Sequence, residues 1–61
     1  MEAIVFYTRY EADGTFAGSD MARRTIDPKV DLVDALRNVE HDLSLIHWQT
    51  VSITGCTFLP A

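Results

Sequence analysis

Residues 27–43 read DPKVDLVDALRNVEHDL, and this stretch decides how the chain folds. Asp27 is a favourable N-cap, and Pro28 is a favourable first helical residue because proline has no N–H group to leave unpaired there. The stretch therefore predicts one amphipathic helix that begins after Asp27 and ends near Leu43. The apolar residues that recur at the spacing of one helix face are Leu32, Ala35, Leu36, Val39 and Leu43.

The segment before this helix predicts two strands joined by a turn. Residues 3–10 are rich in β-branched and aromatic side chains, and both faces of the resulting strand are largely apolar, as in the centre of a sheet. Residues 11–14 end in Asp-Gly, a hairpin signal. Residues 15–26 predict a broken, irregular returning strand because Gly18 and Asp20 are poor strand residues. Residues 21–26 also fit a short helical turn.

The segment after the helix predicts a third strand. Residues 45–54 alternate apolar and polar side chains, but the alternation shifts near Gln49 and Thr50. A bulge there explains the shift, and so does a helix that continues through Ile46 with a strand that begins later. Gly55 is expected to end the regular part, which leaves residues 56–61 as a tail.

The predicted fold class is α+β, with one small ββαβ domain over residues 1–61. Its three-stranded antiparallel sheet has the order 2-1-3, and the helix packs on one face. The other face, expected to carry Val5, Tyr7 and the Trp48 region, would expose apolar side chains. An exposed apolar patch of this kind indicates an interaction surface. In so short a chain apolar burial barely offsets conformational entropy, so a partner is an expected source of stability.

Charge and composition narrow the function classes. The net charge of −4, from 9 acidic and 5 basic residues, disfavours non-specific nucleic-acid binding. The single cysteine, Cys56, excludes an internal disulfide framework. The chain begins Met1-Glu2 without a basic, apolar leader, and no apolar run approaches the ~20 residues of a membrane span. We therefore expect a cytoplasmic protein that does not span a membrane.

The residue types that carry chemistry do not form a recognisable constellation. A catalytic Cys56 needs a nearby base and oxyanion donors, and His41 lies off the apolar stripe. His41, His47 and Cys56 lack the paired spacing of zinc ligands. The aspartates of residues 27–34 lack the spacing of a calcium loop, and there is no glycine-rich phosphate loop. The sequence predicts no catalytic residue, no metal site and no cofactor.

The favoured interpretation is a non-enzymatic protein-binding module that occupies a partner protein's surface. So small and acidic a chain suits an inhibitor or adaptor encoded by a phage or another mobile element. The acidity suits a partner with a basic surface, and aromatic residues commonly dominate such contacts. A homodimer, through the bare face or through sheet edges, is compatible with this interpretation and with the alternative given below. The predicted contacts are Val5, Tyr7, Arg9 and Trp48.

The alternative is a nucleic-acid-linked regulator in which Arg9, Arg23 and Arg24 contact phosphates. The stretch YEADGTF at residues 10–16, followed by DLVDAL at residues 31–36, resembles the hairpin-then-helix start of HicB-type antitoxins. This resemblance covers less than half of the chain, and the Pro- and Gly-rich segment that joins those elements in the family is missing. It implies an antitoxin-like function as the second hypothesis.

Overall fold

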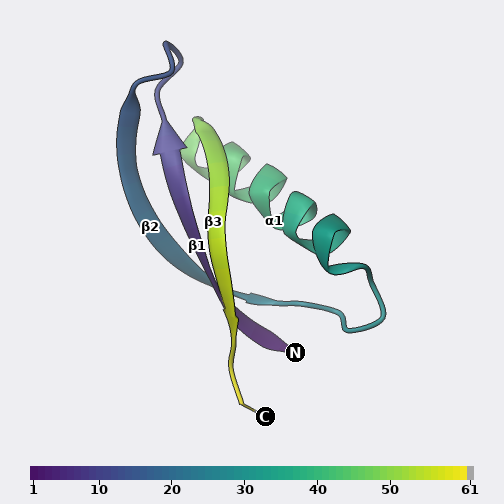
Figure 1. Ribbon diagram of the computed structural model, residues 1–61. Coiled ribbons are helices and arrows are strands. Elements are labelled where there is room, and N and C mark those ends of the chain that lie inside the picture. Colours follow the sequence, from purple (N-terminus) through teal and green to yellow (C-terminus); the bar gives the residue numbers. More distant parts are fainter. Residues whose placement is uncertain (61) are drawn as a thin grey trace.

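The computed structural model describes residues 1–60, which form three strands and one helix. In chain order these are β1 (Glu2–Tyr10), β2 (Phe16–Thr25), α1 (Leu32–His47) and β3 (Thr50–Phe58). β1 is antiparallel to both of its neighbours, and the sheet order is β2-β1-β3. α1 lies on one side of the sheet, against β3 (Figure 1). The predicted α+β fold and its strand order are confirmed.

The start of α1 differs from the sequence prediction. Asp31 is the N-cap, and its Oδ1 accepts a hydrogen bond from Val33 N at 2.8 Å. Asp27 instead begins a tight turn, in which its carbonyl oxygen accepts from Val30 N at 3.2 Å. Pro28 occupies the second position of that turn, where a φ near −65° is also favoured. The predicted N-cap at Asp27 is wrong because an Asp-Pro pair suits a turn as well as a helix start.

The end of α1 supports the longer of the two helices that the sequence allowed. The helix continues through Ile46 to His47, and Trp48 closes it in the left-handed conformation, with φ 55° and ψ 35°. The N–H of Trp48 donates to the carbonyl oxygen of Ser44. The prediction that a strand starts at residue 45 is wrong, because residues 45–47 complete the last turn of the helix.

β3 continues beyond the glycine that was expected to end it. Gly55 pairs with Phe6 of β1, and the pairing runs on to Phe58 opposite Ala3. The register shifts once, opposite Phe6 and Tyr7, so the bulge lies in the middle of β3. The predicted tail is therefore wrong for residues 56–58, while residue 61 lies outside the described residues. Gly55 directly follows Thr54, the residue that the register skips at the bulge, and pairing resumes with Gly55 and Cys56.

β2 runs from Phe16 to Thr25, so the alternative helical turn and a break at residues 18–20 are wrong, whereas the expected irregularity is present as one register shift between Gly18 and Phe16. Its pairing with β1 runs without a shift from Glu2 opposite Thr25 to Arg9 opposite Gly18. A Cβ atom on Gly18 would lie 2.6 Å from Arg9 Nη2, because the arginine side chain crosses the strand there. Gly18 therefore leaves room for Arg9 to reach Asp20, whose Oδ2 lies 3.3 Å from the guanidinium.

The hydrophobic core lies between α1 and one face of the sheet. Ala3 and Ala35 are both buried, and their small side chains allow the helix to approach the strands closely. Ala22, Leu36, Ile53 and Cys56 are partly buried against this core. The predicted helix stripe is confirmed in its central part, whereas Leu32 at its start is exposed. The buried apolar residues are Ala3, Val5, Tyr7, Ile26, Ala35, Val39, Leu43 and Val51.

Candidate functional site

The sheet face opposite α1 exposes large apolar side chains of β1 and β2. Phe6 and Met21 lie directly opposite each other across these strands, and Tyr10 lies opposite Phe16. Phe16 is 66% exposed and Met21 64% exposed. Because alternate residues of a strand share a face, these side chains lie on the same side of the sheet, with the Thr8–Ser19 pair between the two apolar pairs. We define the open face as Ile4, Phe6, Tyr10, Phe16 and Met21.

The surroundings of the open face are polar but nearly neutral. Its charged residues are Arg23 and Glu2, which form an ion pair with Nε and Oε2 at 2.8 Å. The hydroxyl of Thr25 donates to the other oxygen of Glu2. The Thr25 hydrogen bond and then Arg23 hold the pKa of the Glu2 carboxyl below its usual value. Hydroxyl side chains also lie on this face: Thr8, Ser19 and Ser52 form a row between the Phe6–Met21 pair and the Tyr10–Phe16 pair, and Thr57 lies opposite Ile4.

Two of the predicted contact residues lie under the helix and not on the open face. Val5 is 0% exposed and Tyr7 is 4% exposed. An uncovered sheet face exists as expected, but the assignment of Val5 and Tyr7 to it is wrong. Both faces of β1 are apolar, so the alternation alone does not reveal which face the helix covers. The small side chain of Ala3 on the covered face was the available signal.

Arg9, another predicted contact, also lies on the covered side and is held by several groups. Its Nη1 donates to Gln49 Oε1 at 3.0 Å, and its Nη2 lies 3.3 Å from Asp20 Oδ2. Gln49 Nε2 in turn donates to Glu11 Oε1 at 3.1 Å. This network ties the hairpin end of the sheet to the start of β3. Arg9 therefore has a structural role in the chain itself.

The three arginines of the nucleic-acid hypothesis do not converge on one surface. Arg23 lies on the open face beside Glu2, whereas the next residue, Arg24, lies on the covered side by alternation. Arg24 Nη1 donates to the carbonyl oxygen of Arg23 at 2.8 Å. Arg9 lies opposite Gly18, about 20 Å further along the sheet at ~3.3 Å per residue. No phosphate-tracking groove is formed by this set.

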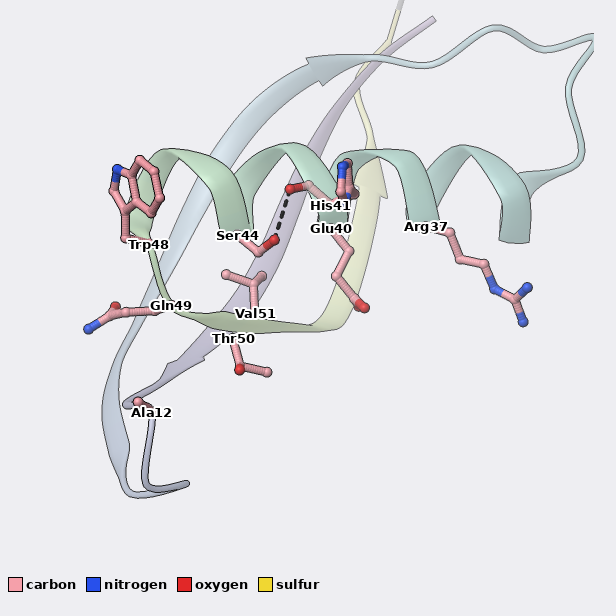
Figure 2. Close-up of a pocket in the computed structure, with 9 residues that line it drawn as sticks. All are labelled: Ala12, Arg37, Glu40, His41, Ser44, Trp48, Gln49, Thr50 and Val51. Carbon is pink, nitrogen blue, oxygen red and sulfur yellow. Dashed lines mark hydrogen bonds between the residues drawn. The ribbon is translucent and has the colours of Figure 1, made fainter.

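Trp48 borders a groove between α1 and β3 and is not part of the open face. Its side chain is 89% exposed at the end of the helix. The groove, of about 520 Å³, is lined by Glu40, His41 and Ser44 of α1 and by Thr50 of β3 (Figure 2). Ser44 Oγ donates to the carbonyl oxygen of His41 at 2.9 Å (Figure 2). The predicted placement of Trp48 on the uncovered sheet face is therefore wrong.

The cysteine and histidine residues are dispersed in the structure. Cys56 packs partly buried against the core, His41 is exposed, and His47 Nε2 lies 2.9 Å from the Tyr7 hydroxyl. Within residues 1–60 no three His, Cys, Asp or Glu side chains gather as a metal-binding group would require. In the same residues, no helix has both the length and the apolar character needed to cross a membrane.

Comparison of the chain with family models, with curated proteins and with solved structures finds no match. Function must therefore be inferred from the geometry of the chain alone. The open face is the feature of that geometry with the clearest physical consequence, because it leaves Phe16 and Met21 in water.

Proposed function

We propose that the protein is a non-enzymatic protein-binding module whose open face occupies the surface of a partner protein. The observation that carries this proposal is the exposure of Phe6, Met21 and Phe16 on the same sheet face. Apolar side chains gathered in this way gain free energy when another protein covers them, and aromatic residues contribute most in such contacts. An inhibitor or adaptor that acts by covering a surface needs no more than this.

The charge distribution indicates the chemistry of the partner. The open face itself is neutral, since Arg23 and Glu2 compensate each other. The net charge of −4 resides largely elsewhere, with exposed carboxylates at Asp34 and Asp42 on α1 and at Asp13 in the hairpin. A fitting partner has an apolar contact patch within a basic surface, because the acidic field then accelerates the encounter. The antitoxin-like alternative gains no support from the separated arginines.

The test compares two charge insertions at exposed apolar positions. Met21→Glu places a carboxylate on the open face, and Leu45→Glu does so on the outer side of α1, where Leu45 is 55% exposed. Immobilised wild type and Leu45→Glu should retain a protein from extracts of the native host that Met21→Glu loses. With that protein purified, Met21→Glu should weaken binding at least about tenfold, or ~1.4 kcal/mol. Circular dichroism verifies that each variant is folded.

The proposal fails if the folded Met21→Glu variant binds as tightly as the wild type. It fails equally if Leu45→Glu abolishes binding while Met21→Glu does not, because the contact would then lie on α1. Trp48→Ala in the same assay tests whether the partner binds the groove and not the open face. We expect this variant to retain the partner.

A further inference from the structure

The two outer edges of the sheet differ in how well they are protected. At β3 the backbone N–H of Ile53 donates to Glu40 Oε2 at 3.2 Å, and α1 packs against this strand. β2 is the other outer strand, and α1 lies away from it in Figure 1. An uncovered edge of this length offers a row of backbone donors and acceptors to another strand.

The outward-facing backbone groups of β2 can be identified from its pairing with β1. Met1 N donates to Ile26 O at 3.0 Å and Ile26 N donates to Met1 O at 2.6 Å, so these residues form a hydrogen-bonded pair. Such pairs alternate along an antiparallel ladder, and the register is unbroken from Thr25 to Gly18. The residues whose N–H and C=O groups point outward are therefore Ser19, Met21, Arg23 and Thr25.

We propose that a second copy of this chain pairs antiparallel with the free edge of β2, across a two-fold axis at Ala22. An axis normal to the sheet keeps both helices on one side and sets residues of the same face opposite each other. In this register Asp20 lies opposite Arg24 of the second copy. By the two-fold symmetry, Arg24 lies opposite Asp20 of the second copy. Opposite charges directly across a sheet are stabilising.

The neighbouring registers lack this complementarity. With the axis at Asp20, the Asp20 carboxylates of the two copies lie opposite each other. With the axis at Arg23, the Arg23 guanidinium groups of the two copies lie opposite each other. Like charges in these positions are destabilising. An axis at Met21 brings no opposite charges together. The charge pattern of β2 therefore favours one self-complementary register.

The present contacts of Arg24 fit a role in this pairing. In the single chain Arg24 Nη1 donates to Arg23 O at 2.8 Å and so covers one outward acceptor. On pairing, that carbonyl accepts from Met21 N of the second copy, and the guanidinium turns to Asp20 of the second copy. Asp20 Oδ2 lies 3.3 Å from Arg9 Nη2, and its half-exposed side chain leaves Oδ1 for the new contact.

Pairing would also bring the open face to the size of an ordinary interface. The nine residues of β1, at ~3.3 Å each, give the length of the sheet, and three strands at ~4.8 Å spacing give its width, so one open face measures about 430 Å². In standard complexes each partner contributes about 800 Å². Two joined sheets present about 850 Å² on one side. This inference goes beyond the proposed function, which a single open face could also perform.

A charge-exchange experiment tests the pairing by sedimentation velocity. The wild type should form a dimer whose population rises with concentration. Arg24→Asp and Asp20→Arg each set like charges opposite each other and should weaken dimerisation at least about tenfold, or ~1.4 kcal/mol. An equimolar mixture of the two variants should form heterodimers, because every introduced charge then faces its opposite. Arg37→Asp, the same change at an exposed position of α1 beside the groove, should dimerise like the wild type.

Disulfide formation tests the register in a Cys56→Ser background. Ala22→Cys should cross-link on oxidation, because residues of a non-hydrogen-bonded pair on the axis have Cα atoms about 4.5 Å apart. Ser19→Cys should not, because the two positions would lie about 20 Å apart along the strands at ~3.3 Å per residue.

The pairing is overturned by a wild type that is monomeric at every concentration, or by Arg24→Asp dimerising as well as the wild type. A dimer abolished by Phe16→Glu but kept by Arg24→Asp would mean that the copies meet through their open faces, which also overturns it. The proposed function is tested separately, because Met21→Glu should lose the partner and keep the dimer. Its carboxylate would lie opposite Arg23 of the second copy.

Discussion

The hydroxyl of Tyr7 and Nε2 of His47 lie 2.9 Å apart, which joins the central strand to the last turn of α1. Their ring centroids are 5.6 Å apart, and the Tyr7 side chain is buried. This contact spans elements that are distant in sequence and fixes the end of the helix beside the sheet. It also places a polar bond at the edge of an otherwise apolar core.

Tyr7→Phe should lower the free energy of unfolding by about 1 kcal/mol, because it removes one hydrogen bond without leaving a cavity. Urea denaturation followed by circular dichroism measures the change. Tyr10→Phe is the matched control: within residues 1–60 its hydroxyl makes no side-chain hydrogen bond. Equal stability of Tyr7→Phe and the wild type would show that the contact contributes nothing.

Asp31→Ala should cost about 1 kcal/mol of stability, because it removes the oxygen that accepts from Val33 N at the start of α1. Asp31→Asn should retain most of the stability, since asparagine is an equally good N-cap. Asp27→Ala affects the preceding turn and should leave the helix content unchanged. A loss of helical signal in Asp27→Ala but not in Asp31→Ala would contradict the observed helix start.

Trp48→Gly should raise the free energy of unfolding by about 1 kcal/mol, because glycine adopts the left-handed conformation without the cost borne by other residues. The indole is almost fully exposed, so little packing is lost. Trp48→Ala retains the Cβ atom and should be nearly neutral, which makes it the control. Thermal or urea unfolding compares the three proteins, and a destabilised Trp48→Gly would show that the indole stabilises the groove.

Acid should destabilise the protein in part through Glu2. Hydrogen bonding from Thr25, and then Arg23, lowers the pKa of Glu2 in the folded state. A lowered folded pKa stabilises the protein above the unfolded value of about 4.3, and this stabilisation is lost as the pH falls through the folded pKa. Urea denaturation at a series of pH values should show a shallower loss of stability below pH ~4.3 in Glu2→Gln than in the wild type.

Asp34→Asn, at an exposed carboxylate on α1, is the control for this experiment. This variant also removes one carboxylate and so measures the effect of losing one negative charge. Asp13, whose pKa is lowered by the hydroxyl and then the backbone N–H of Thr15, contributes in the same direction and remains unchanged in both variants. Parallel curves for Glu2→Gln and the wild type would exclude the contribution of Glu2.

The strand order and the helix could be predicted from the sequence because each rests on a strong local pattern. β1 is apolar on both faces, which suits only the central strand of a three-stranded sheet. The stripe through Ala35, Val39 and Leu43 indicates a helix with a single buried side. These two patterns leave few other ways to pack so short a chain.

The open face was assigned to the wrong side, because the small size of Ala3 is the one local feature that points to the covered side and the other deciding features are contacts between strands. The alternation of side chains along β1 places Phe6 and Tyr7 on opposite faces of the sheet. It does not indicate which of the two faces the helix covers. The path of β2 depends on Arg9 crossing Gly18 toward Asp20, a contact between strands that no single segment reveals. The helix start was ambiguous because Asp27 and Asp31 are the same residue type in similar local settings.

Because Glu40 accepts the outward N–H of Ile53 and α1 packs against β3, the β3 edge is less open to a further strand than the β2 edge. Once two β2 edges have met, both outer borders of the joined sheet are β3 edges beneath a helix. We therefore expect such an assembly to stop at two chains and not to extend into a fibril.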